Sequence, residues 1–289
     1  MTSLVHYFLC LGSITCLADD PAALAAEVTD LERGRTKGLY LITEVGQSNS
    51  HLATRTLARF DAGAREFVLE SPDAGAAKFC SAGTRGIPQT AVVLARLSVG
   101  GTDRGVFGFV VPLTDSRGPL PGVEISSPLA LSALPLDYVQ VRFRGVRVPY
   151  PHWLSDGARI TADGTCHDPL AAAGQEARLQ RTLRAGLGLW AVLPSVAAAL
   201  CRQSAVLALT FARRRITQGR LAPGASLLAY RTQQRAVVGA LADSFALTCA
   251  AGRAQQLWRQ RRDRPEELSD PVAGCSPWAA VSRPLAAYK

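Results

Sequence analysis

The sequence predicts an α+β protein in which helical segments flank a strand-rich centre. Residues 1–36 have a helical pattern, residues 37–152 hold short alternating runs, and residues 153–289 hold long stretches rich in Ala and Leu. Short alternation is typical of strands, whereas long stretches with broad apolar faces are typical of helical bundles. We therefore expect an N-terminal helical remnant, a central β domain and a partial C-terminal bundle, with boundaries after residues 36 and 152.

The N-terminal residues predict a helix with a defined start. Pro21 follows Asp19 and Asp20 and opens a run of helix-forming residues, at the early position that proline favours in helices. The apolar stretch 5–18 superficially resembles a secretory signal, but the first basic residue of the chain is Arg33, so no positive charge precedes it. We favour a buried helix of a cytoplasmic protein over a secreted or lipid-anchored protein.

The β domain is predicted from runs in which β-branched and aromatic residues alternate with polar ones. The clearest runs are residues 66–70, 90–97, 105–113 and 138–148. Turn segments rich in Gly, Pro and Asp separate these runs, and no helical pattern lies between them. Several short strands in succession favour a small antiparallel barrel or sandwich.

The C-terminal region predicts two long helices, over residues 179–213 and 227–262. The segment 219–225 contains Pro and Gly and is the expected connection between them, and a last short helix is expected at 278–289. Broad apolar faces suit these helices to a bundle. Because an incomplete bundle exposes such a face over residues 179–209, we expect a homo- or hetero-oligomer.

The composition excludes several classes of function. The chain has 32 Lys and Arg against 23 Asp and Glu, which gives a net charge of +9, and only three of these basic residues are lysine. The arginines are scattered and aromatic residues make up 7% of the chain, so nucleic-acid binding is not expected. No uninterrupted apolar run reaches the roughly 18 residues that span a bilayer, so no membrane partner is expected.

Cysteine and histidine patterns give no metal site. The seven cysteines share no spacing and include no CxxC pair, and the four histidines are dispersed. Neither arrangement is typical of a zinc site. The simplest interpretation is a set of reduced, mostly buried thiols in a cytoplasmic protein.

Two short segments carry the functional signal. Residues 43–49 follow the apolar run 39–42 and enter a small, polar turn, and residues 78–83 repeat this layout further along the chain. Two such turns facing each other would form a shelf of backbone N–H groups and hydroxyls, suited to a flat polar ring and a phosphate chain. The sequence therefore predicts a bound cofactor. We interpret Lys78 as a surface charge and Cys80 as a packing residue rather than a nucleophile.

The order of several motifs resembles the acyl-CoA oxidases, within the wider acyl-CoA dehydrogenase superfamily. The run Thr43-Glu44-Val45-Gly46 is similar to the Thr-Glu-Leu-Gly signature of that family. Further similar stretches, in family order, are residues 6–13, 67–72, 77–79, 105–113, 119–123, 146–149 and 230–234, and a segment that opens at Arg214. Together these motifs cover nearly the whole chain.

The resemblance implies FAD as the cofactor, lying between the β domain and the bundle. The residues implied to bind it are Thr43, Glu44, Gly46, Ser48, Phe79, Ser81, Gly83 and Arg214. The Thr43 hydroxyl is implied to contact the flavin ring, and residues 79–83 are implied to back it. Arg214 is implied to bind a cofactor phosphate across a subunit interface, a role that the guanidinium geometry suits.

The activity that the resemblance implies is α,β-desaturation of an acyl-CoA or acyl-carrier thioester. A carboxylate removes the α proton while a hydride leaves the β carbon for the flavin, and in an oxidase oxygen then re-oxidises the flavin. The catalytic carboxylate is expected beyond Lys289 or on a partner chain, with Glu176 as the candidate within this chain. The alternative is a non-catalytic homologue that acts as the partner subunit of an active relative.

Overall fold

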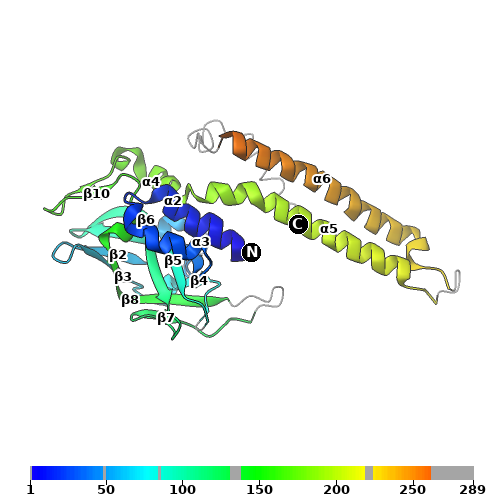
Figure 1. Ribbon diagram of the computed structural model, residues 1–289, viewed down its shortest axis with the longest axis horizontal. Helices are drawn as coiled ribbons and strands as arrows, with labels where there is room; N and C mark the ends of the chain where they lie inside the picture. Colours follow the sequence, from blue (N-terminus) through cyan, green and yellow to red (C-terminus); the bar gives the residue numbers. More distant parts are fainter. Residues whose placement is uncertain (1, 48–49, 84–85, 131–137, 219–223, 262–289) are drawn as a thin grey trace. The chain divides into compact units, whose positions relative to one another are not determined.

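The computed structural model describes residues 2–47, 50–83, 86–130, 138–218 and 224–261 of the chain. The chain divides into two compact units, Met1–Gly186 and Leu187–Lys289. The first unit contains the N-terminal helices, the sheet and helix α4, and the second contains two long helices (Figure 1). Because strands and α4 follow residue 152 within the first unit, the units divide later than the domain boundary that we expect from the sequence.

Short helices at the N-terminus cover one face of the sheet. They are α1 (Thr2–Leu4), the wide π-helical turn η1 (Val5–Leu11), α2 (Gly12–Leu17), the 3-10 turn η2 (Ala22–Leu24) and α3 (Ala25–Glu32). Cys10, Ile14 and Leu17 are fully buried and pack in one cluster with Val92 and Val110 of the sheet. The apolar N-terminal stretch is therefore a core helix of this unit.

His6 fixes this helical layer to the strand that follows it. The amide of Gly38 donates a hydrogen bond to Nδ1 of His6 at 2.7 Å, and Nε2 lies 3.0 Å from the carbonyl oxygen of Leu31. A carbonyl oxygen only accepts hydrogen bonds, so Nε2 carries the proton and the buried ring is the neutral tautomer. One side chain thus joins η1, α3 and the first strand.

The main sheet has nine strands. They are β1 (Lys37–Leu41), β2 (Leu57–Asp61), β3 (Glu66–Glu70), β4 (Lys78–Cys80), β5 (Gln89–Val99), β6 (Thr102–Thr114), β7 (Val123–Ile125), β8 (Val139–Pro149) and β9 (Trp153–Leu154). Their order is β4-β8-β3-β2-β5-β6-β9, with β1 beside β5 and β7 beside β8. Side chains on the inner face form a continuous apolar core that includes Phe67, Phe107, Phe109 and Phe143.

The α+β class is confirmed, but the sheet is mixed rather than wholly antiparallel. Both β1 and β2 run parallel to β5, with Lys37 opposite Gln89 and Leu57 opposite Arg96. The chain leaves the sheet after β1, makes the excursion 42–56, and returns in the same direction along the same edge of β5. Local alternation predicts each strand but carries no information on which strand it pairs with, so the parallel pairs were not predicted.

An isolated bridge joins the ends of β1 and β4. β5 connects through β2, β3 and β8 to β4, and it also pairs directly with β1. Glu44, three residues beyond β1, forms an isolated antiparallel bridge with Lys78 at the start of β4. The bridge therefore brings together two strands that are otherwise connected only through the rest of the sheet.

Smaller elements connect the sheet to α4. They are η3 (His51–Ala53), η4 (Ala74–Ala76), η5 (Tyr150–His152), the hairpin of β10 (Arg159–Ile160) and β11 (Cys166–His167), η6 (Ala171–Ala173) and α4 (Gly174–Leu183). Buried Arg181 of α4 forms an ion pair with Asp168 at 2.6 Å and lies over the ring of Phe107. The hydroxyl of Thr182 donates to the carbonyl oxygen of Val106 at 2.8 Å, so α4 is held against β6.

The second unit is a helical hairpin of α5 (Gly186–Arg214), the turn η7 (Leu227–Ala229) and α6 (Arg231–Arg261). Buried residues recur every seven positions at 198, 205 and 212 on α5 and at 237, 244 and 251 on α6, and Ala254 and Leu257 of α6 are buried as well. A seven-residue repeat is typical of helices that pack along one seam. Ser195 accepts a hydrogen bond from Gln255 at 2.7 Å, and Thr248 accepts one from Arg202 at 2.8 Å, so the two helices are antiparallel.

Two stretches of this unit meet the length and hydropathy of a membrane span. Among the described residues these are Val192–Arg214 and Arg231–Gln260. This result does not contradict the absence of an uninterrupted apolar run of about 18 residues, because mean hydropathy over a window tolerates scattered polar residues. One or two such helices are weak evidence of a membrane protein, since helices of water-soluble proteins pass the same test, and we assign no membrane role.

Replacing Gly38 with Ala tests the packing of the helical layer. An added Cβ would lie 2.9 Å from Cβ of Cys10 and 3.1 Å from Nδ1 of His6, so Gly38→Ala is expected to lower the free energy of unfolding by about 1–3 kcal/mol. Gly12→Ala is the control, because its new Cβ would meet only the carbonyl oxygen of Tyr7 at 3.4 Å. Urea unfolding measures both, and equal stability of the two variants would contradict the packing described.

Candidate cofactor site

The two segments singled out in the sequence lie side by side in the structure. Val45 donates a backbone hydrogen bond to Ala77 at 2.9 Å, Phe79 donates one to Thr43 at 3.0 Å, and Gly46 donates one to Gly75 at 2.8 Å. These bonds align residues 43–46 antiparallel to residues 75–79. The two segments therefore lie next to each other, while their convergence on a cofactor stays a prediction.

Strand alternation places different side chains on the two faces of this pair. Glu44 and Lys78 are bridge partners with fully buried side chains, exposed by 1% and 0%, so they lie on the inner face. Thr43 and Phe79, one position away on each segment, lie on the opposite face and are half-buried. The ring of Phe79 stacks on Tyr138, with centroids 5.9 Å apart and planes 15° apart. A hydroxyl and an aromatic surface thus occur together on one face.

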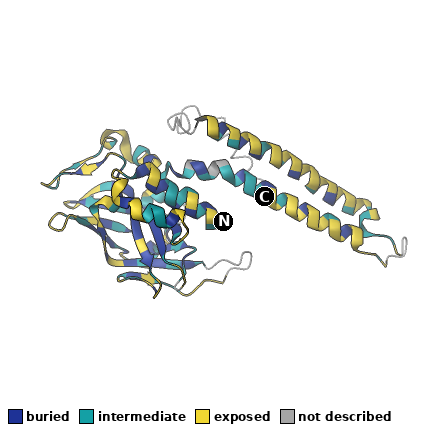
Figure 2. Ribbon diagram, in the orientation of Figure 1, coloured by how far each residue is buried: buried dark blue, intermediate teal, exposed yellow. Residues whose placement is uncertain are grey.

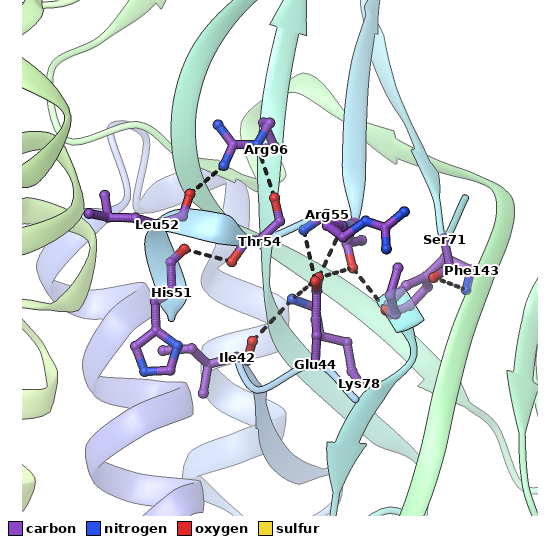
Figure 3. Close-up of polar contacts among 12 residues, drawn as sticks. Ile42, Glu44, His51, Leu52, Thr54, Arg55, Ser71, Lys78, Arg96 and Phe143 are labelled. Carbon is purple, nitrogen blue, oxygen red and sulfur yellow. Dashed lines mark hydrogen bonds and ion pairs between the residues drawn. The ribbon is translucent and has the colours of Figure 1, made fainter. Parts of the chain in front are cut away.

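Glu44 and Lys78 form a buried ion pair. The Lys78 ammonium lies 2.9 Å from Oε1 of Glu44 and donates to the carbonyl oxygen of Ile42 at 3.2 Å (Figure 3). Burial lowers the pKa of Lys78 to about 8, against the opposing attraction of the carboxylate. Burial alone would raise the pKa of Glu44, but the Lys78 charge and hydrogen bonds from Thr56 outweigh it and hold that pKa below its ordinary value. Both groups are charged at neutral pH.

The same carboxylate closes the excursion between β1 and β2. Oε1 of Glu44 accepts hydrogen bonds from the amide of Thr56 at 2.9 Å and its hydroxyl at 2.7 Å, and Oε2 accepts one from the amide of Arg55 at 2.8 Å. The guanidinium of Arg96 donates to the carbonyl oxygens of Thr54, at 2.9 Å, and of Leu52. The described residues of this stretch, 44–47 and 50–56, are called the loop 44–56 below, and one side chain joins its two ends (Figure 3).

The expected shelf of open backbone donors does not form as predicted. The amides of Val45, Gly46 and Phe79 pair within the two segments, and the amide of Gly83 donates to the side chain of Gln89 at 2.9 Å. These donors are used by the protein because adjacent extended segments satisfy each other's backbone groups. The polar groups that the face offers are instead the hydroxyls of Thr43 and, after β4, of the half-buried Ser81.

Gly46 has a structural reason to lack a side chain. A Cβ at this position would lie 3.1 Å from both Cα and the carbonyl oxygen of Gly75. Two glycines thus allow the two segments to approach closely at this end. The sequence predicted a close approach of the backbone to a ligand, whereas the close approach seen here is between two segments of the protein. The neighbouring predicted residue, Ser48, lies outside the described residues.

Lys78 corrects one interpretation made from the sequence. It is fully buried rather than a surface charge, because it is the ion-pair partner of Glu44. Burial raises the pKa of the Cys80 thiol to about 11, which keeps it protonated and agrees with its interpretation as a packing residue. Glu44 itself stays a predicted cofactor residue, but the contacts of its carboxylate are all with the protein around it.

Two further predicted residues lie on other elements. Glu176 is exposed in the first turn of α4, where a negative charge favours the positive end of the helix dipole. Arg214 is exposed at the last residue of α5, in the second unit. Their roles as base and phosphate ligand stay predictions, because their positions by themselves do not connect them to the face of Thr43 and Phe79.

Sequence reasoning missed the residues that support the site. These residues are Thr56, Arg96, Gln89 and Lys37. The burial of Lys78 was missed as well. One signal was present: lysine is rare in this Arg-rich chain, yet two of its three lysines lie here. The Lys37 ammonium donates to the carbonyl oxygen of Ser81, just after β4. A compact ammonium fits a narrow buried space that a planar guanidinium would not, which is a reason to retain lysine at such positions.

Known proteins similar to this chain are acyl-CoA oxidases. No protein-family model matches the chain. Acyl-coenzyme A oxidase 2, peroxisomal, of Arabidopsis thaliana is 30% identical over 221 residues, which cover 72% of this chain and 31% of that protein. Acyl-coenzyme A oxidase 3 of Yarrowia lipolytica is 27% identical over 233 residues, covering 78% of this chain and 32% of that protein. This chain thus spans about a third of the length of these curated relatives.

Solved structures give the same result for the fold. The tomato acyl-CoA oxidase superposes with a TM-score of 0.76 at 20% identity, covering 99% of this chain and 46% of that one. The Caenorhabditis elegans acyl-CoA oxidase-2, which was solved with FAD, ascaroside-CoA and ATP, gives a TM-score of 0.76 at 22% identity and covers 91% of this chain and 39% of that one. At these identities the structures establish the shared fold.

The expected cytoplasmic location is wrong. Curated relatives from Arabidopsis thaliana and Homo sapiens are named as peroxisomal enzymes. The six cysteines that the structure describes are free, but only Cys10 and Cys80 are buried. Free thiols indicate a reducing environment and do not distinguish one such compartment from another, which is why the cysteine pattern could not give the location.

Acid sensitivity tests the state of Glu44. A carboxylate whose folded pKa is lowered stabilises the protein above its unfolded pKa of 4.5, and that stabilisation is lost as pH falls through the lower folded pKa. At pH 7, Glu44→Gln leaves Lys78 buried without a counter-charge and is expected to cost about 3–5 kcal/mol. In urea unfolding the difference from wild type should shrink as the pH falls below 4.5 and through the lower folded pKa of Glu44. A difference that stays constant over this range would contradict the buried ion pair.

Proposed function

We propose that this chain, which belongs to the acyl-CoA oxidase and dehydrogenase superfamily, forms the flavin-binding part of an FAD-dependent enzyme that desaturates an acyl thioester. The observation that carries this proposal is the convergence of two separate segments, which brings Thr43 and Phe79 onto one face. The match to acyl-CoA oxidases over 72% of the chain supports the same reading. By the same relatives, we infer that the enzyme works in the peroxisome.

The residues on this face fit a flavin ring. Phe79 is half-buried and backed by Tyr138, so it offers a rigid aromatic surface. The Thr43 hydroxyl, beside it, supplies a donor and acceptor for the polar edge of such a ring. Ser81 extends the polar rim, and Arg214 is proposed to bind a phosphate of the cofactor. When bound, FAD supplies the acceptor for a hydride from the substrate.

The work of this chain in the reaction is to bind and orient. Thr43 and Phe79 fix the plane of the ring, and the carboxylate of Glu44, beside Thr43, joins that segment to Arg55 and Thr56. Removal of the α proton requires a carboxylate, which we propose comes from outside the residues that the structure describes, since Glu176 is exposed on α4. A purified chain that binds FAD but does not oxidise acyl-CoA would place it in the alternative class, a non-catalytic partner subunit.

The helical hairpin is proposed to associate with further helices or another subunit. Figure 2 shows much of α6 and the distal part of α5 exposed. The exposed apolar side chains of this unit are Leu200, Val206, Leu207, Phe211, Ile216, Val238, Leu241 and Phe245. Phe245 is exposed by 68%, and together with Val206 and Leu241 it lines an open groove. Exposed apolar surface of this kind is typical of protein–protein contacts.

FAD titration tests the proposed function. The purified chain is expected to bind FAD and quench its fluorescence. Thr43→Val should weaken binding about 5–30-fold, the effect of losing one hydrogen bond of about 1–2 kcal/mol. Thr102→Val is the matched control, because Thr102 is exposed at the start of β6. Absence of FAD binding by the wild-type chain, or equal affinity of the two variants, would reject the proposed site.

Light scattering tests the proposed association. The wild-type chain is expected to form oligomers, and Phe245→Glu should dissociate them, because a carboxylate on the apolar face cannot be buried without a partner. Gln234→Glu places the same charge at an exposed polar position of α6 and should leave the association unchanged. A stable wild-type monomer, or equal dissociation by both variants, argues against association through this face.

A further inference from the structure

We propose that Glu44 and Lys78 are positioning residues for the cofactor face: their ion pair holds Thr43 and the loop 44–56 in the geometry that receives FAD. This inference rests on the function proposed above. Neither side chain reaches that face, because both are buried on the inner side of the strand pair. Their effect on a ligand is therefore exerted through the backbone between them.

Lys78 holds the residues on both sides of Thr43. Its ammonium contacts the carbonyl oxygen of Ile42 and the carboxylate of Glu44, at 3.2 and 2.9 Å. The next residue, Phe79, donates its amide to the carbonyl oxygen of Thr43 itself. Residues 42–44 are thus held by residues 78 and 79 of β4. This leaves the Thr43 side chain one direction in which to project.

Glu44 performs the same task for the loop. One carboxylate joins the residue that begins the excursion to Arg55 and Thr56, which end it, through three hydrogen bonds. Loop ends held together in this way limit the conformations available to the residues between them. A second tether is the ion pair between Arg55 and Asp73, which ties the loop to the segment just before β4.

The charges around the pair explain why it gives geometry rather than stability. Lys78 is faced by Glu44, by carbonyl groups and by half-buried His51, whose pKa is lowered first by burial and then by the Lys78 charge. Removing two charges from water is costly, and an apolar pair of similar size often stabilises a protein as well. What an apolar pair lacks is direction: it cannot hold Ile42, Arg55 and Thr56 at fixed hydrogen-bonding positions.

A set of three variants separates positioning from stability. Lys78→Met and Glu44→Gln each leave one buried charge alone and should lower the melting temperature strongly. The double variant Glu44→Gln with Lys78→Met restores neutrality and should recover much of the melting temperature. If the pair is a positioning device, amides of residues 45–56 in the double variant should exchange with solvent at least about tenfold faster than in wild type, and FAD should bind at least about tenfold more weakly.

The control is an exposed ion pair of the same chain. Glu124 and Arg144 pair across β7 and β8 with side chains exposed by 46% and 56%, so Glu124→Gln with Arg144→Met should leave melting, exchange and FAD binding near the wild-type values. A double variant at residues 44 and 78 with wild-type exchange and FAD affinity would overturn the proposal, because the pair would then be structural only.

Two further outcomes are also decisive. If the wild-type chain binds no FAD, the proposed function fails, while the exchange of residues 45–56 still tests the positioning of the loop. If the charge-removing variants do not fold, hydrogen exchange of backbone amides in the wild-type chain without FAD tests the positioning role. The amides of Val45, Arg55 and Thr56 should then be protected, and rapid exchange at these amides would overturn the proposal.

Discussion

The seam between β1 and β4 contains one buried ion pair. β1 and β4 do not form a regular ladder with each other; the bridge between Glu44 and Lys78, their ion pair and the backbone hydrogen bonds beside it join them. A carboxylate and an ammonium hold this seam because each reaches several backbone groups at once, which apolar side chains cannot do. The arrangement of the candidate site follows from this constraint.

Strand alternation places the side chains that support the structure and those proposed to bind the cofactor on opposite faces of the sheet. Residues 44 and 78 face inward and form the seam, so residues 43 and 79 must face the other way. The Thr-Glu pair therefore contains two adjacent residues with different tasks, one on each side of the sheet. This division explains how a buried salt bridge occurs beside a surface suited to a flat cofactor.

Much of the fold was predictable from local patterns. The strands over residues 105–113 and 138–148 and the last long helix appear where alternation and helical periodicity place them, whereas the helix expected over residues 179–213 is divided between α4 and α5. The parallel pairing of β1 and β2 with β5 was not predictable, because it depends on contacts distant in sequence. Nothing local distinguishes a strand that pairs in parallel from one that pairs antiparallel.

The site was predictable in position but not in mechanism. Two similar turns indicated that residues 43–46 and 78–83 act together, and they do lie together. The sequence suggested open backbone donors, yet adjacent segments use those donors on each other, as extended backbones generally do. The scarcity of lysine in the composition was a signal that Lys78 is unusual, but its burial depends on the contact of β4 with the segment after β1, which is distant in sequence.

In the function proposed above, one face, carrying Thr43 and Phe79, receives the cofactor. The most direct measurement is an NMR chemical-shift map of the isotope-labelled chain as FAD is added. The account predicts that the largest shifts fall on the amides of residues 43–46 and 79–83, with smaller shifts along the loop 44–56. Shifts that cluster elsewhere, or that leave these segments unchanged while FAD binds, would contradict it.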